Sequence, residues 1–364
     1  MFIAITSVAG IAETNDTVVE KITTEASYVF DIGRVLSGGI EQHNFYMGMI
    51  DIALTANLWK NGELYVQVEN THGGQPSNKY VGDIHTFSNI ENANKTYLYM
   101  AWYKHTFNKL TTTFGVHDLN SEFINSDYAS NFCNSSFGIQ PSASWNLPVS
   151  IFPINTVGLV LSYDISDNLK FQTSLYDGDP MDLDVDPYNL NFSIDPKNEG
   201  FISFSELHVK TYNNTLETTN TYKFGFQYHT AQCINYKDST VHKGNYGFYA
   251  IGDHTFSKNL GGFFQFGITP EELNLNSLYV GAGITLQNMQ KRPTDIFGLA
   301  LAYGKISPHF VEYSQTHETA LELFYSTEIL PNIHIKPDLQ YIINPGAANT
   351  KRALVGFIRC SLDL

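Results

Sequence analysis

Apolar and polar residues alternate along most of this chain, and the alternation is clearest in its last two segments. In the run 333–343, Ile335 and Leu339 share one face of the predicted strand, and Asp338 lies on the other. A strand separates alternate side chains in this way when its two faces meet different environments. The run 351–363 repeats the pattern after an Asn-Pro-Gly turn. These two runs therefore predict a β-hairpin at the end of the chain.

The same alternation recurs through the chain, and strands with charge on one face and aliphatic side chains on the other suit a wall between lipid and water. The sequence therefore predicts an all-β fold, a transmembrane antiparallel β-barrel of about 16 strands. The predicted strands lie at 27–36, 44–58, 63–70, 95–107, 109–117, 156–164, 168–176, 200–210, 220–230, 244–256, 260–268, 276–289, 295–304, 319–329, 333–343 and 351–363.

Tight turns between these strands alternate with longer connections. The long connections are 71–94, 118–155, 177–199, 231–243 and 305–318. A bacterial barrel with both chain ends in the periplasm has short turns there and long loops outside, so we expect the long connections to be extracellular. A soluble or surface-exposed β-sandwich that binds glycans is the alternative, although a sandwich has no reason to sort its loops by parity.

Composition and charge narrow the classes of protein further. No apolar run approaches the ~20 residues that a transmembrane helix needs, so strands would have to cross a membrane instead. The 22 Tyr and 25 Phe supply material for the aromatic girdles of a barrel. The formal net charge of −15 argues against nucleic acid as a partner. Outer-membrane lipid and lipopolysaccharide are the surroundings that a barrel predicts.

The start of the chain resembles the end of a secretory signal. Residues 1–12 combine an apolar run with Gly10 and Ala12 at small-residue positions. We interpret this segment as a signal-peptide remnant and 13–364 as a single porin-like barrel domain. The chain contains three cysteines, which show no metal-binding spacing and cannot all pair.

Several stretches resemble the carbohydrate-selective outer-membrane porin family, OprB. The most specific are SEFINSDYASNFCNSSFG at 121–138 and PDLQYIINPG at 337–346, and ALVGFIRCSLDL at 353–364 adds to them. The resemblance implies passive passage of mono- or oligosaccharides across the outer membrane of a Gram-negative bacterium, through an eyelet that inward-folding outer loops shape. It also implies a monomer or a homotrimer. The chain departs from the family pattern at Ser326, where an arginine is common, and at Leu364, where an aromatic residue is usual.

A sugar-selective pore needs planar polar groups for hydroxyl pairs and aromatic faces for the apolar side of pyranose rings. Parity places four polar residues of the C-terminal strands toward the lumen, and these are Glu322, Asp338, Gln340 and Arg359. The longest loop is the natural constriction element, and its predicted contributors are Asp118, Asn120 and Glu122. The alternative for each residue is that its side chain contacts water in the lumen and does not contribute to sugar selectivity.

The sequence contains no catalytic constellation. Its twelve histidines show no His-Glu-x-x-His pattern, and its serines lie in no nucleophile elbow. We therefore predict a channel that is not an enzyme and that uses neither cofactor nor metal. The acidic balance and the four arginines predict a weak preference for cations over anions.

Overall fold

The computed structural model describes residues 22–181, 183–288 and 292–364, and these form sixteen strands. The predicted signal remnant at 1–12 lies outside the described residues. The strands are β1 (Ile22–Gly39), β2 (Asn44–Trp59), β3 (Gly62–Gly73), β4 (Lys95–Phe107), β5 (Leu110–Val116), β6 (Val157–Ser166), β7 (Leu169–Asp177), β8 (Phe201–Asn213), β9 (Thr218–Ile234), β10 (Val241–Thr255), β11 (Leu260–Ile268), β12 (Asn276–Gln287), β13 (Ile296–Ile306), β14 (His317–Leu330), β15 (Ile333–Ile343) and β16 (Lys351–Asp363).

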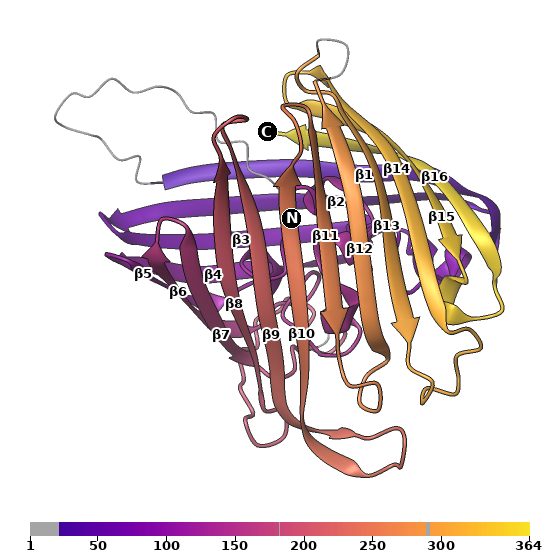
Figure 1. The fold of residues 1–364 in the computed structure, drawn as a ribbon, viewed down its shortest axis with the longest axis horizontal. Coiled ribbons are helices and arrows are strands. Elements are labelled where there is room, and N and C mark those ends of the chain that lie inside the picture. The colour runs from indigo at the N-terminus through magenta and orange to yellow at the C-terminus, as the bar shows by residue number, and fades with distance from the viewer. Residues whose placement is uncertain (1–21, 182, 289–291) are drawn as a thin grey trace.

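Each strand pairs with its neighbours in the chain, and β1 pairs antiparallel with β16 to close the sheet. Asp31 lies opposite Arg359 in this closing pair. Figure 1 shows the long strands side by side around one barrel. A closed sheet without edges satisfies its backbone groups internally, as a membrane requires. The structure therefore confirms the predicted sixteen-stranded barrel and excludes the two-sheet sandwich.

The alternation of side chains follows the two faces of the wall. On β12, Val280 and Ile284 are exposed on the outer face, whereas Thr285 between the outer positions Ile284 and Leu286 is fully buried. Many large apolar side chains on the other strands are exposed in the same way. Such a surface would be unfavourable in water and is favourable against lipid. The outer face is therefore the lipid-facing one.

Placing a charge on this face is expected to destabilise the barrel. Ile284→Arg should cost about 2–4 kcal/mol if the residue lies near the bilayer midplane, because a guanidinium would have to enter hydrocarbon. The free energy of unfolding in urea, measured in lipid vesicles, checks this. Ile284→Leu is the matched control and should cost less than about 1.5 kcal/mol. Equal costs for the two variants would contradict the assignment of this face.

The connections differ in length at the two ends of the barrel. One end carries the segments 74–94, 117–156 and 178–200, while the other end has mostly tight turns. The predicted loop 231–243 is shorter than expected, because β9 and β10 continue to pair as far as Ile234 and Val241. This extended hairpin projects past the rest of the wall in Figure 1.

Short helical turns occur within the connections. They are η1 (Ser77–Val81), η2 (Leu119–Ser121), η3 (Ala129–Asn131), α1 (Ser135–Gly138), α2 (Pro141–Ser144) and η5 (Pro345–Ala347). Among the described residues, no helix has the length and apolar character to cross a membrane.

Apolar side chains of the longest connection pack against the inner wall. Phe132 lies 4.9 Å from Phe324 of β14 and 5.6 Å from Phe263 of β11, measured between ring centroids. Phe137 also contacts Phe263, at 5.6 Å. All four rings are buried. The segment 117–156 therefore folds into the barrel and fills part of it.

Candidate functional site

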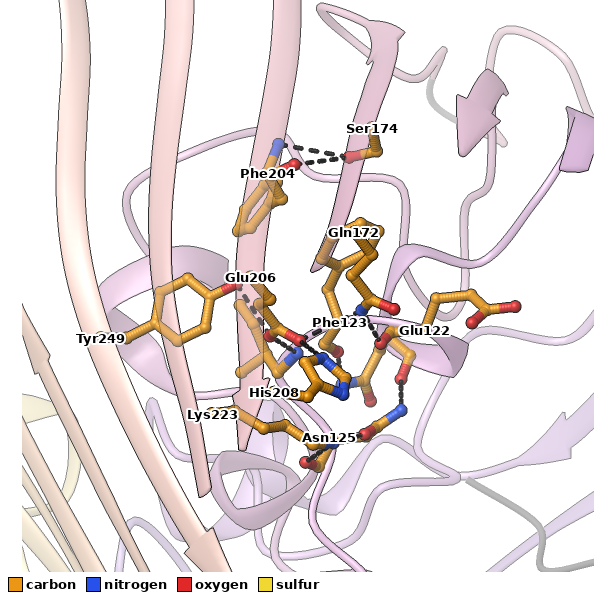
Figure 2. A network of polar contacts seen from close by, with 12 residues as sticks. Glu122, Phe123, Asn125, Gln172, Ser174, Phe204, Glu206, His208, Lys223 and Tyr249 are labelled. Carbon is orange, nitrogen blue, oxygen red and sulfur yellow. Dashed lines mark hydrogen bonds and ion pairs between the residues drawn. The ribbon is translucent and has the colours of Figure 1, made fainter. Parts of the chain in front are cut away.

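The inward-folded segment 117–156, called the constriction loop below, is held by carboxylates of the inner wall. Glu206 of β8 is fully buried, and its Oε1 accepts the backbone N–H of Ile124 at 2.7 Å. The same carboxylate receives Tyr249 Oη at 2.9 Å and lies 2.7 Å from His208 Nε2. Figure 2 shows these groups converging on Glu206 from neighbouring strands and from the loop.

The same arrangement recurs around the barrel. Asp253 of β10 accepts the backbone N–H of Asp127 at 3.1 Å and the hydroxyl of Ser126 at 2.5 Å. Glu318 of β14 accepts the N–H of His85, in the segment 74–94, at 2.7 Å. A buried N–H group left without such an acceptor costs about 1–3 kcal/mol. Several such hydrogen bonds together give the inward segments a defined position.

Glu322 and Gln340 belong to this set of anchors. Glu322 Oε1 accepts the N–H of Cys133 at 2.6 Å, and its Oε2 accepts the N–H of Asn134 at 2.8 Å. Gln340 Oε1 accepts from Asn134 Nδ2 at 3.1 Å, and Gln340 Nε2 donates to the carbonyl of Phe87 at 2.7 Å. Glu322 and Gln340 are fully buried. They point inward as predicted, and the inward segments cover them.

Asp338 and Arg359 also point inward from the C-terminal strands. Asp338 Oδ1 accepts from Gln340 Nε2 at 3.2 Å. Arg359 binds Asp31 of β1 through two hydrogen bonds of 2.8 and 2.9 Å, and its Nη1 donates to Asn89 at 2.7 Å. The guanidinium therefore joins the two strands that close the barrel to the segment 74–94.

A group of metal-binding side chain types lies within this region. One potential ligand atom each of Cys133, Glu322 and Asp338 lies within 4.8 Å of the other two. Both Glu322 oxygens already accept loop amides, and Lys336 Nζ donates to the carbonyl of Asn131 at 2.8 Å. Glu322 and Lys336 thus serve as contacts between the wall and the constriction loop, and we assign no metal to this group.

Asp118 and Asn120 shape the entry to the constriction loop. Asp118 caps η2 by accepting the N–H of Asn120 at 2.9 Å, and it receives Tyr99 Oη at 3.0 Å. Asn120 Nδ2 donates to the carbonyl of Gly138 at 2.9 Å. These are local contacts of the kind that fix a turn. Burial raises the pKa of Asp118, which lies in the loop beyond β5.

Glu122 behaves differently from these anchors. Its backbone carbonyl accepts from Gln172 Nε2 at 2.6 Å, whereas Figure 2 shows its carboxylate pointing away from the network around Glu206. The carboxylate lies 3.9 Å from Lys104 Nζ of β4, and the side chains of the two residues are 25% and 32% exposed. Glu122 and Lys104 therefore meet water at the place where the loop reaches toward β4.

The anchors leave one part of the inner wall less covered. The constriction loop is bonded to β7–β12 and to β14–β15, since Lys223 of β9, Gln265 of β11 and Tyr279 of β12 also donate to its carbonyl groups. The opposite wall carries Glu25 on β1, which is exposed, and Glu63 on β3, which is half-buried. The cross-strand register places Glu63 opposite Lys104. Both acids lie near the strand ends that the tight turns join, whereas Asp51 of β2 and Glu69 farther along β3 are buried.

His85 connects the two inward segments. Its ring lies between Ser136 of the constriction loop and the carbonyl of Glu318, to which Nε2 lies at 3.2 Å. Burial lowers the pKa of His85 to about 4. The imidazole is therefore neutral near pH 7, and the hydrogen bonds around it suit the neutral ring.

Protonation of His85 opposes the folding of the segment 74–94, whereas burial raises the pKa of Asp83 to about 6 and of Glu91 to about 8, so protonation of these two carboxyl groups acts in the opposite direction. The pKa of His85 falls from 6.5 to about 4 on folding. The free energy of unfolding therefore decreases as pH drops through that interval, by roughly 3 kcal/mol at most from this group. The stability that His85 contributes is complete above about pH 6.5. Protease cleavage of 74–94 in intact barrels, followed from pH 7.5 to 4.5, measures the effect. In His85→Gln, cleavage should accelerate less between about pH 6.5 and 4.5 than in the unaltered protein, and an unchanged profile would contradict the role of His85.

The anchoring carboxylates Glu206, Asp253 and Glu318 were not among the predicted site residues. Each stands at an inward position of its strand, but the residues beside it give little apolar contrast, and these are Ser205 and Leu207, Gly252 and His254, and His317 and Thr319. The sequence does not show which inward acids a loop will cover. That choice depends on how the loop folds.

A closed sixteen-stranded barrel with a lipid-facing outside and inward-folded segments is the architecture of outer-membrane porins of Gram-negative bacteria. The model of the carbohydrate-selective porin, OprB family, matches residues 47–363, and the chain belongs to this family. The membership and the fold place the protein in the outer membrane of a Gram-negative bacterium.

Comparison with solved structures supports the fold. The high-pH structure of Pseudomonas putida OprB superposes with a TM-score of 0.84 at 18% identity, covering 94% of each chain. The outer-membrane channel DcaP of Acinetobacter baumannii gives a TM-score of 0.61 at 10% identity, covering 94% of this chain and 97% of that one. Identities this low show a shared fold.

A curated relative matches over a shorter stretch. Porin AaxA of Chlamydia abortus is 32% identical over 89 residues. The match covers 24% of this chain and 20% of that protein. The matched part of this chain thus corresponds to about a fifth of the length of this relative.

Proposed function

We propose that this protein is a passive porin that lets mono- and oligosaccharides diffuse across the outer membrane. The observation that carries the proposal is the constriction loop, which wall carboxylates hold inside a closed barrel. Such a barrier excludes large solutes while a wetted passage remains beside it. Passage is downhill and needs neither a cofactor nor catalysis.

Liposome swelling tests this function. Purified protein in liposomes should allow glucose to enter and cause swelling in an iso-osmotic glucose solution. A disaccharide and a trisaccharide of glucose should enter more slowly in that order, because the constriction limits size. Heat-unfolded protein is the control. Swelling no faster than in protein-free liposomes would contradict the proposed function.

The predicted site residues act on the pore in two ways in this proposal. Glu322, Gln340 and Arg359 determine the width of the passage by holding the inward segments, and their hydrogen bonds to those segments support this role. Asp338 acts through Gln340, whose Nε2 donates to its Oδ1. The other predicted residues lie on the constriction loop itself and have two different roles. Asp118 and Asn120 shape it, and Glu122 faces the lumen.

The uncovered wall predicts how the pore treats ions. Glu25 and Glu63 place carboxylates on the solvent-accessible part of the inner wall, where negative charge attracts cations. We expect a weak preference for cations. Replacing both residues by glutamine should shift the zero-current potential in a salt gradient toward anion preference. Glu312→Gln, an exposed substitution in the segment after β13, is the control, and equal shifts in both would contradict this assignment.

We propose that lipopolysaccharide and phospholipid surround the apolar outer face. Exposed bases at one end of the β1–β16 seam support contact with lipid phosphates, and these are Arg34, Lys351 and Arg352. A monomer and a homotrimer both fit a barrel that encloses its own pore. Native mass spectrometry in detergent distinguishes the two states and detects retained lipid.

A further inference from the structure

Aromatic and charged side chains gather on the inner wall beside the constriction loop. Tyr65 of β3 and Trp102 of β4 are cross-strand partners, and their rings stack with centroids 4.9 Å apart at an angle of 16°. Lys104 Nζ lies 4.6 Å from the centroid of the Trp102 ring. The carboxylate of Glu122 approaches this lysine from the loop side. Two neighbouring strands and the constriction loop thus contribute to one cluster.

The position of this cluster follows from the strand register. Tyr65 lies two residues from Glu63 and Gln67 along β3, so these three side chains share the inner face. On β5, the residue opposite Trp102 is Gly115, and beyond the end of β5 the His117 ring meets the Trp102 ring edge-on, with centroids 6.2 Å apart. Tyr65 is half-buried, whereas Trp102 lies beneath it and beneath Lys104 with 9% of its surface exposed. Tyr65 is therefore the ring nearer the lumen.

The polar groups of the cluster are held in place. Tyr65 Oη donates to Gln67 Oε1 at 2.8 Å, which restricts the rotation of the ring. Lys104 and Glu122 lie 3.9 Å apart, which is longer than the usual charged hydrogen bond of ~2.8 Å. Their exposed groups can each reach a third partner. An ammonium donates and a carboxylate accepts, so a hydroxyl group can bond to both.

We propose that Tyr65, Lys104 and Glu122 form a sugar-contact subsite at the constriction, with Trp102 supporting the Tyr65 ring. Its ligand is a pyranose, whose apolar ring face lies on Tyr65 and whose hydroxyl groups bond to Lys104 and Glu122. An aromatic ring favours such a face because both surfaces are apolar and flat. This inference rests on the proposed function and names the residues that would contact the sugar.

A comparison of glucose with sorbitol tests the subsite. The two molecules have similar size and polarity, but only glucose presents a ring face. Sugar block of the single-channel current in KCl should occur at lower glucose than sorbitol concentrations in the unaltered protein. In Tyr65→Leu, the half-blocking concentration of glucose should rise roughly three- to ten-fold, and the preference over sorbitol should disappear.

Matched variants separate this role from a structural one. Tyr65→Phe keeps the ring and should retain the preference for glucose. Tyr163 lies on the outer face and is 46% exposed. Tyr163→Leu removes this tyrosine and should leave sugar block unchanged. Glu122→Gln alters the polar side of the subsite through an exposed loop residue and should weaken block by glucose. Heat-modifiable migration on gels confirms that each variant is folded.

The outcomes distinguish the subsite from the proposed function. Glucose entry into liposomes together with unchanged glucose block in folded Tyr65→Leu and Glu122→Gln would overturn the subsite and leave the sugar porin standing. Absence of glucose entry with the unaltered protein would overturn the function and the subsite with it. If Tyr65→Leu loses the preference for glucose while its conductance in KCl is unchanged, the result supports both the subsite and the proposed function.

Discussion

Asp31→Asn is expected to destabilise the barrel by about 3–5 kcal/mol, because it leaves the buried Arg359 guanidinium without its charged partner. The pair is buried at the seam where β1 meets β16, and it also holds Ser88 and Asn89 of the segment 74–94. The substitution preserves the size of the side chain and removes its charge. Urea unfolding in lipid vesicles, followed by tryptophan fluorescence, measures the loss.

Removing both members of the pair separates charge from packing. The double variant Asp31→Leu, Arg359→Met leaves no unpaired charge and should lose less stability than Asp31→Asn alone. If Asp31→Asn lost less than about 1 kcal/mol, the pair would not be a buried anchor of the seam.

Glu322→Ala is expected to release the middle of the constriction loop. The substitution removes the acceptor of two buried N–H groups, those of Cys133 and Asn134, at a cost of about 1–3 kcal/mol for each. The strands keep their own hydrogen bonds, so the loss should fall on the loop more than on the barrel. Protease cleavage within 125–140 should become faster, and the single-channel current should become noisier.

The control for this variant is Glu25→Ala. Glu25 is also an inward carboxylate, but it is exposed and lies on the less covered wall. Its loss should leave protease cleavage of the loop unchanged. Equal cleavage of the loop in Glu322→Ala and in the unaltered protein would show that other contacts hold this segment.

Strand patterning predicted the barrel well because the outer face reports directly on lipid contact. The run around Ile284 and the hairpin with Asp338 both have the predicted parity in the structure. The predicted ends were less accurate. β1 begins at Ile22 and ends at Gly39, beyond the predicted 27–36, because polar residues continue to pair after the apolar alternation stops.

The site was harder to predict than the wall. Parity showed correctly that Glu322 and Gln340 point inward, but an inward residue can face either water or a folded loop. The structure places the loop over both residues. Lys104 gave a weaker signal, because its proximity to Glu122 arises only when the loop crosses the lumen. Contacts between distant segments decide such positions, and alternation along one strand does not report them.

The wall carboxylates bind the constriction loop mainly through its backbone amides, and every residue except proline carries that donor. Mutations in the loop can therefore change its lumen-facing side chains without removing the groups that dock it. The barrel can therefore hold constriction loops that differ in their lumen-facing side chains. A library that varies Glu122 and its exposed neighbours, with Glu206, Asp253 and Glu322 kept, should yield folded pores with altered solute preference.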